Sequence, residues 1–281
     1  MQEKVYREKN LDARDVCEGR KTAAARETAC DACEAACNAC EAVEAHAVCE
    51  TAEKASVRGR ARIRVRIGYA AAAAQGVSGD QAVSCELPDG RFALILSDGM
   101  GKGAQAAAES RRLVRRLRGN LKKGMSPARA IKEVNRFMIR PDSFATMDLA
   151  LLDREMGQAK FYKMGAASSF LVRGAHVRRI DQAALPIGII PTLKLTHRSA
   201  PLALGDIIVM VSDGITEADK EDDEARWLQE ILRQIRTGRE SAETIVPRRL
   251  ARKILEEAQQ RCGCREHDDL TVLVALVEST R

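Results

Sequence analysis

Aspartate residues recur in this sequence beside short apolar stretches that are typical of buried strands. Two such stretches end in the same tripeptide, Ser-Asp-Gly, with the aspartates at Asp98 and Asp213. Asp80 precedes another strand-like segment, and Asp268 and Asp269 precede the last apolar stretch of the chain. A carboxylate at the end of a buried strand is held in place by the strand, and a following glycine allows another group to approach the backbone closely.

The chemistry that these side chains indicate is binding of a hard divalent cation. The set offers carboxylate oxygens with little His or Cys beside them, which favours Mg²⁺ or Mn²⁺ over zinc. Clustered carboxylates repel one another, and a cation neutralises that repulsion. A single Asp-Gly is more often an ordinary turn, so the metal-site interpretation depends on the whole set occurring together.

Four segments resemble the motifs of the PPM (protein phosphatase 2C) superfamily. They are Val77-Ser78-Gly79-Asp80, Asp98-Gly99-Met100-Gly101-Lys102-Gly103, Ser212-Asp213-Gly214-Ile215-Thr216-Glu217-Ala218 and Asp268-Asp269-Leu270-Thr271-Val272. Within the superfamily the chain is most similar to the phosphatase domain of stage II sporulation protein E. That similarity is carried by Asp98 to Gly103, by Ala145-Thr146-Met147-Asp148 and by Leu185-Pro186-Ile187-Gly188-Ile189.

The resemblance implies a site with two Mn²⁺ or Mg²⁺ ions. Asp98 would bridge both ions, and the carbonyl of Gly99 would bind one of them. Asp213 and Asp268 would complete the coordination of the other ion, so Asp98, Asp213 and Asp268 are the implied catalytic residues. Asp80 would bind nearby through water. Asp269 occupies a position where other members often carry Asn, and it is included as a candidate ligand.

The resemblance also implies a reaction and a substrate class. The expected activity is hydrolysis of phosphoserine or phosphothreonine on a regulatory partner, an anti-sigma factor antagonist, in sporulation or sigma-factor control. Two cations sharing a water lower its pKa, so that water rather than a protein nucleophile attacks phosphorus. The phosphate-binding basic residue is left unassigned.

The predicted elements place the aspartates within an α+β fold. Helices are expected over residues 103–123, 127–138, 223–236 and 241–261 from their apolar periodicity. One short strand is expected to begin after residue 80. Others are expected over residues 91–97, 147–152, 160–164, 169–172, 176–180, 195–203, 207–211 and 270–277. Mostly short turns join the strands, which predicts a largely antiparallel β-sandwich flanked by helices. A basic, alternating strand near residues 58–67 is interpreted as a solvated face, with a nucleic-acid patch as the alternative.

Composition sets limits on the function classes. The chain of 281 residues is 45% hydrophobic, 31% charged and 3% aromatic, with a formal net charge of +6. Few aromatic residues and a mixed surface charge argue against nucleic-acid binding. No secretory leader or membrane span is expected, so we expect a cytoplasmic protein whose nine cysteines stay reduced.

The chain is expected to divide into residues 1–58 and residues 59–281. The first part is predicted to be a helical, cysteine-rich segment that regulates the site or forms a homodimer, followed by the phosphatase domain. Its cysteines Cys30, Cys33, Cys37 and Cys40 repeat with a period of seven, as in a helical packing seam. Zinc binding by these cysteines is the alternative.

The residues leave two other functions open. The chain could be a non-catalytic relative that only binds phosphoproteins, although its aspartate set is intact. It could also be a cysteine-rich metal-binding regulator in which the remaining domain is a passive scaffold. Turnover of a phosphoserine substrate and the zinc content of the purified protein distinguish these alternatives from the enzyme.

Overall fold

The computed structural model describes residues 63–74, 76–140, 143–219, 221–222, 225–237, 245–263 and 267–279. The helical segment predicted for residues 1–58, with its cysteines and its proposed dimer contact, lies outside the described residues. The boundary near residue 58 therefore stays a prediction.

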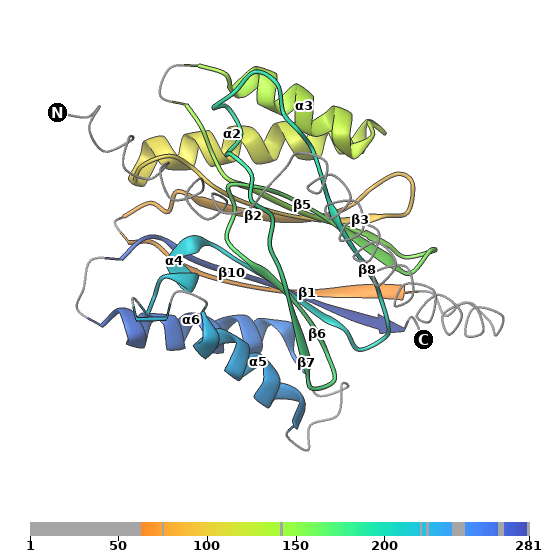
Figure 1. The fold of residues 1–281 in the computed structure, drawn as a ribbon, viewed down its shortest axis with the longest axis vertical. Coiled ribbons are helices and arrows are strands. Elements are labelled where there is room, and N and C mark those ends of the chain that lie inside the picture. The colour runs from red at the N-terminus through yellow and green to blue at the C-terminus, as the bar shows by residue number, and fades with distance from the viewer. Residues whose placement is uncertain are drawn as a thin grey trace, which may run out of the picture. The chain divides into compact units, whose positions relative to one another are not determined.

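Ten strands form two five-stranded sheets in which every pairing is antiparallel within the described residues (Figure 1). The first sheet has the order β1 (Ile63–Ala72), β10 (Leu270–Ser279), β9 (Ile207–Val211), β6 (Ser169–Arg173) and β7 (His176–Ile180). The second has the order β2 (Asp80–Glu86), β3 (Phe92–Asp98), β4 (Met147–Asp153), β5 (Gln158–Met164) and β8 (Arg198–Pro201).

Helices cover the outer face of each sheet (Figure 1). The second sheet is covered by α2 (Gly103–Lys122) and α3 (Pro127–Met138). The first sheet is covered by α5 (Arg226–Thr237) and α6 (Pro247–Cys262). A single-turn helix, α4 (Asp213–Thr216), follows β9 directly.

Apolar side chains form three layers, one between the sheets and one beneath each pair of helices. Strand β10 shows how one sequence serves two of them. Val272 and Val274 pack toward α6, whereas Leu273 and Ala275 between them pack toward the other sheet. Because both faces of the strand are covered, its sequence is apolar at nearly every position instead of alternating with polar residues.

The predicted fold class, an α+β antiparallel sandwich flanked by helices, is confirmed. In the described part of the chain, no helix is both long enough and apolar enough to cross a membrane.

Candidate active site

The topology brings the motif aspartates to one end of the sandwich. Asp80 opens β2 and Asp98 closes β3, and these two residues face each other in the antiparallel register. In the other sheet, Asp213 follows β9, whereas Asp268 and Asp269 precede β10, which is the antiparallel neighbour of β9. Stacking of the two sheets therefore places both pairs of strand ends together.

The backbone of Asp98 is fixed from both sides by Thr146. The Asp98 N–H donates to Thr146 Oγ1 at 2.9 Å, and the Thr146 N–H donates to the Asp98 carbonyl at 2.8 Å. The Ser97 hydroxyl donates to the Thr146 carbonyl at 2.7 Å. Thr146 lies just before β4, so the second sheet itself orients the carboxylate of Asp98. In the sequence, Thr146 is only part of a motif, and nothing local indicates that it anchors Asp98.

Glycines are required where backbone segments meet at the site. A Cβ on Gly99 would lie 1.9 Å from the carbonyl oxygen of Ala106 in α2, a distance that no side chain can occupy. A Cβ on Gly214 would lie 2.4 Å from the carbonyl oxygen of Asp269. The glycine of each Ser-Asp-Gly therefore permits close packing beside its aspartate, as the sequence predicted.

Ser212 joins the end of β9 to the start of β10. Its hydroxyl donates to the Asp269 carbonyl at 3.1 Å and accepts from the Thr271 N–H at 2.9 Å. The serine that precedes Asp213 therefore holds the Asp268-Asp269 segment beside it. The repeated Ser-Asp-Gly was the sequence signal, but it did not indicate this partner.

Asp269 is buried, and both of its carboxylate oxygens accept hydrogen bonds from the backbone. Oδ1 accepts from the N–H of Ala74 at 2.7 Å, and Oδ2 accepts from the N–H of Gly79 at 2.6 Å. These bonds fix the loop that leads into Asp80. Oδ2 of Asp269 and Oδ1 of Asp98 lie 3.2 and 3.4 Å from the position that a Cβ on Gly79 would take, so the two carboxylates are near neighbours.

The electrostatics of the site favour a positive ligand. Burial raises the pKa of Asp98 to about 8, and the charges of Asp80, Asp213, Asp268 and Asp269 add to the rise. Burial likewise raises the pKa of Asp80 to about 7; the hydroxyls of nearby residues oppose the rise, and the carboxylates of Asp213 and Asp269 add to it. Burial and the charge of Asp268 also raise the pKa of Asp213.

Asp80 provides the clearest test of whether a cation fits. It is 2% exposed, and although the hydroxyls of Thr271 and Ser212 lie near it, neither of its carboxylate oxygens has a partner in hydrogen-bond geometry among the described residues. A buried carboxylate in this state is costly unless it is protonated or neutralised by a cation. The donors are all hard oxygens, which fits Mg²⁺ or Mn²⁺.

The carboxylates do not enclose an ion by themselves. Across the described ranges, no three His, Cys, Asp or Glu side chains lie close enough to hold one ion. A cation here would therefore also need oxygens from the backbone or from water, as Mg²⁺ commonly has. The structure thus brings the five predicted aspartates and Gly99 to one place, and their assignment as ligands stays a prediction.

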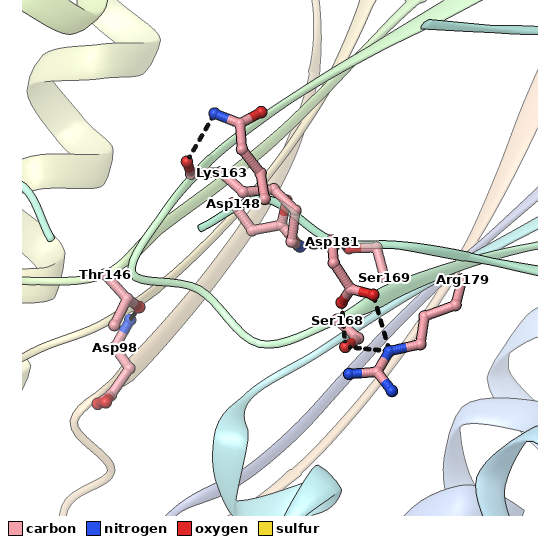
Figure 2. Close-up of polar contacts among 9 residues, drawn as sticks. Asp98, Thr146, Asp148, Lys163, Ser168, Ser169, Arg179 and Asp181 are labelled. Atoms are coloured by element: carbon pink, nitrogen blue, oxygen red, sulfur yellow. Dashed lines mark hydrogen bonds and ion pairs between the residues drawn. The ribbon is translucent and has the colours of Figure 1, made fainter. Parts of the chain in front are cut away.

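A buried ion pair that sequence reasoning missed lies beside the site. Lys163 and Asp148 are fully buried, and Asp148 Oδ2 accepts from Lys163 Nζ and from Ser169 Oγ, each at 2.5 Å. Asp148 also lines a small cavity, of about 10 Å³, together with Asp98, Thr146 and Asp213. Figure 2 shows Asp98 and Thr146 to one side of this pair.

A second polar cluster continues from the pair along β6 and β7. The Ser168 hydroxyl donates to Asp181, and Arg179 Nε donates to Ser168 Oγ at 2.9 Å and pairs with Asp181 at 2.9 Å (Figure 2). These contacts hold the segment between β5 and β6, whose Ala166 and Ala167 form one wall of the small cavity.

Comparison with known proteins agrees with this geometry. The sequence profile of the stage II sporulation protein E (SpoIIE) family matches residues 88–278. Stage II sporulation protein E from Bacillus subtilis (strain 168) is 33% identical over 221 residues, which is 76% of this chain and 26% of that protein. The chain therefore spans about a quarter of the length of this relative.

Solved structures show the same fold. The PP2C phosphatase domain with a fragment of the regulatory domain of SpoIIE from Bacillus subtilis superposes with a TM-score of 0.70 at 32% identity, covering 78% of this chain and 64% of that chain. The RsbU and RsbW domains of Rv1364c from Mycobacterium tuberculosis give a TM-score of 0.64 at 25% identity, covering 77% and 61%. The chain belongs to the stage II sporulation protein E family, and the part that it shares with these relatives is a PP2C-type phosphatase domain.

Proposed function

We propose that this chain is a metal-dependent protein-serine/threonine phosphatase that hydrolyses phosphoserine or phosphothreonine on a regulatory partner. The observation that carries the proposal is the convergence of five aspartates at one end of the sandwich. One of them, Asp80, is buried with both carboxylate oxygens unpartnered among the described residues. Such a cluster is unfavourable for folding alone and is explained by a role in binding cations.

The candidate ligands differ in whether their carboxylate oxygens already accept hydrogen bonds from the protein. Asp98, Asp213 and Asp268, with the carbonyl of Gly99, would bind two Mn²⁺ or Mg²⁺ ions, and Asp80 would act through water. When bound, such ions lower the pKa of a water that attacks phosphorus and offset the charge of the phosphate. Asp269 is better described as a positioning residue, because backbone N–H groups already occupy both of its oxygens.

The chain's own residues supply rigidity, and neither free cysteine of the described residues lies at the site. Thr146 and Ser212 hold Asp98 and the Asp268-Asp269 segment at fixed positions, which lowers the cost of ordering the site when substrate binds. Among the described residues, the free cysteines are Cys85 and Cys262. Cys85 lies in β2 under α2 and Cys262 is buried at the end of α6, so neither lies with the aspartates.

The proposed partner is an anti-sigma factor antagonist, in sporulation or sigma-factor control. Membership of the stage II sporulation protein E family supports this class of partner. The relatives are much longer than the matched region, so the assignment of this substrate class to the chain is a proposal.

The test is hydrolysis of a phosphoserine peptide by the full chain with Mn²⁺, with and without excess EDTA. We expect Mn²⁺-dependent release of phosphate that Asp213→Asn reduces at least about 100-fold, since one ligand to the activating ions is lost. Asp89→Asn is the matched control, because Asp89 is exposed in the turn at the opposite end of β2 and β3. Activity that persists in EDTA would contradict the proposal, and binding of the peptide without turnover would favour the non-catalytic phosphoprotein-binding alternative.

A further inference from the structure

Helix α2 carries a dense, one-signed stripe of charge on its outer face. The helix contains one acidic residue, Glu109, and six basic residues, which are Arg111, Arg112, Arg115, Arg116, Arg118 and Lys122. Positions 111, 112, 115 and 116 are spaced three or four apart in pairs, which places their side chains together along the helix. The opposite face packs Leu113, Leu117 and Leu121 into the core.

These arginines border a groove with a volume of about 710 Å³. The described residues that line it are Ala108, Arg111, Arg112, Arg115, Arg116, Gly119, Asn120, Lys123 and Phe137, with no Asp or Glu among them. Ala108 and Gly119 have little or no side chain, so the groove is open between the arginines. Its lining is therefore strongly positive and sterically accessible.

Three of the four lining arginines are not neutralised by the described part of the protein. Arg112 pairs with Glu109 at 3.0 Å, but Arg111, Arg115 and Arg116 form no ion pair with any described residue. Elsewhere in the described ranges, many arginines have a carboxylate partner, such as Arg173 with Asp206 at 2.7 Å. The groove can therefore pair its arginines with the negative charges of a ligand.

The aromatic ring of Phe137 orders one wall of the groove. The guanidinium carbon of Arg116 lies 3.9 Å from the centroid of the Phe137 ring, and that of Arg140 lies 5.1 Å from it. A guanidinium stacked on an aromatic face is held in one orientation and keeps its N–H donors free for a carboxylate or phosphate. Arg116 is thus positioned in advance for a planar anionic group.

The groove begins close to the catalytic end of the molecule. Helix α2 starts at Gly103, just after the Asp98-Gly99 motif, and its first turn packs against Gly99 through Ala106. At a rise of about 1.5 Å per residue, Arg111 lies about 12 Å and Lys123 about 30 Å along the helix from Gly103. An extended peptide covers this range in about four to nine residues.

We infer that the α2 groove, defined by the lining residues above, docks an acidic stretch of the phosphoprotein substrate while its phosphorylated residue occupies the active site. This inference rests on the proposed phosphatase function. A polypeptide fits better than a nucleic acid, because the groove has a single aromatic residue, already covered by arginines, and so offers no stacking platform. Docking through such charges lowers the KM for a protein substrate without changing the chemical step.

The first experiment measures docking without turnover. A fluorescent peptide of ten glutamates, and its glutamine counterpart, are titrated with the full chain at low salt. We expect the glutamate peptide to bind at least about tenfold more tightly and to lose that advantage as salt rises. The variant Arg111→Glu/Arg115→Glu should remove the difference between the two peptides.

The matched control is Arg178→Glu/Arg198→Glu, which makes the same charge change at exposed positions in β7 and β8. It should retain the preference for the glutamate peptide. Equal binding of both peptides by the unaltered chain would overturn the inference. An equal loss in the control would also overturn it, because net charge rather than the groove would then explain binding.

The second experiment separates docking from catalysis. Phosphoserine peptides carrying a glutamate or a glutamine block, four to nine residues from the phosphoserine, are compared with p-nitrophenyl phosphate. The Arg111→Glu/Arg115→Glu variant should raise KM for the glutamate peptide about tenfold, with kcat and p-nitrophenyl phosphate turnover unchanged. An unchanged KM would overturn the docking inference even in an active enzyme. If no phosphorylated compound is hydrolysed, the proposed function fails, and the binding experiment still decides whether the groove docks acidic chains.

Discussion

Asp268 and Asp269 are adjacent in the sequence but have different surroundings in the structure. Both oxygens of Asp269 accept backbone hydrogen bonds, whereas Asp268 Oδ1 accepts only from the N–H of its neighbour among the described contacts. A carboxylate whose oxygens already accept backbone hydrogen bonds has fewer free lone pairs with which to coordinate a cation. The two residues should therefore respond differently to the same substitution.

We predict that Asp268→Asn lowers the affinity for Mn²⁺ at least about tenfold, because it removes a charged ligand. Asp269→Asn should change that affinity less than about threefold, since the amide keeps one oxygen acceptor. Instead, Asp269→Asn should destabilise the fold by about 1–3 kcal/mol, because one buried backbone N–H loses its acceptor. Isothermal titration calorimetry with Mn²⁺ measures the affinity, and urea unfolding measures the free energy of unfolding. Equal losses of Mn²⁺ affinity would contradict the positioning role of Asp269.

The raised pKa values predict an unusual pH dependence for the metal-free protein. The native state holds protons on Asp98 up to about pH 8 and on Asp80 up to about pH 7, whereas the unfolded chain releases them near the ordinary value of 3.8. Because the native state then binds more protons, stability should fall as pH rises from about 4 to about 8. Asp98→Asn should make this decline shallower.

The measurement is the melting temperature in EDTA between pH 5 and pH 8.5. Asp89→Asn is the control. The hydrogen bond between Asp89 and Arg91 lowers the pKa of Asp89, so titration of Asp89 affects stability only at acidic pH. A slope that is identical in the unaltered chain and in Asp98→Asn would contradict a raised pKa of Asp98 in the native state.

At the residue scale, the sequence predicted which carboxylates belong to one candidate site but not what holds them. Asp80, Asp98, Asp213, Asp268 and Asp269 could be found because each lies beside a recognisable strand. The partners of these residues come from distant segments, as Ala74 does for Asp269, and a single sequence carries no local signal for such contacts. Lys163 was missed for the same reason, because its burial depends on pairing with Asp148 from the neighbouring strand.

At the scale of the elements, the Lys163–Asp148 pair joins β5 to β4 inside the fold. Lys163→Met leaves a buried carboxylate without its cation and should cost about 3–5 kcal/mol of unfolding free energy. Lys163→Met/Asp148→Leu should recover most of the loss, because no unpaired charge remains. Urea unfolding of the full chain measures both.

The exposed pair Arg136–Glu133 on α3 provides the control for this prediction. Arg136→Met should change the unfolding free energy by less than about 1 kcal/mol, because solvent screens that pair. If Lys163→Met costs no more than Arg136→Met, the buried pair does not contribute to the fold as described.

Most elements could be predicted because their patterns are local. The expected bounds of α3, β7 and β9 agree with the structure, and those of α2, β4 and β10 differ by one or two residues at an end. Helix α4 was not predicted, because a single turn has no amphipathic period. The strand order could not be predicted either, since pairs such as β1 with β10 join opposite ends of the domain.

At the scale of the whole molecule, the role of residues 1–58 remains a prediction. We expect that removing them changes either the basal phosphatase activity or the oligomeric state, because this segment is predicted to regulate the site or to pair two chains. Phosphate release and light scattering of the truncated and full chains measure the two properties. Unchanged values of both would dismiss a regulatory or dimerising role, and zinc in the purified full chain would support the metal-binding alternative for its cysteines.

The proposed activity depends on separate parts of the chain forming a shared binding site for divalent cations. Calorimetric titration of the metal-free full chain with Mn²⁺ tests it most directly. We predict two ions per chain and loss of both in Asp98→Asn, with Asp89→Asn binding as the unaltered chain does. Failure to bind Mn²⁺, or unchanged binding by Asp98→Asn, would contradict a shared cation site.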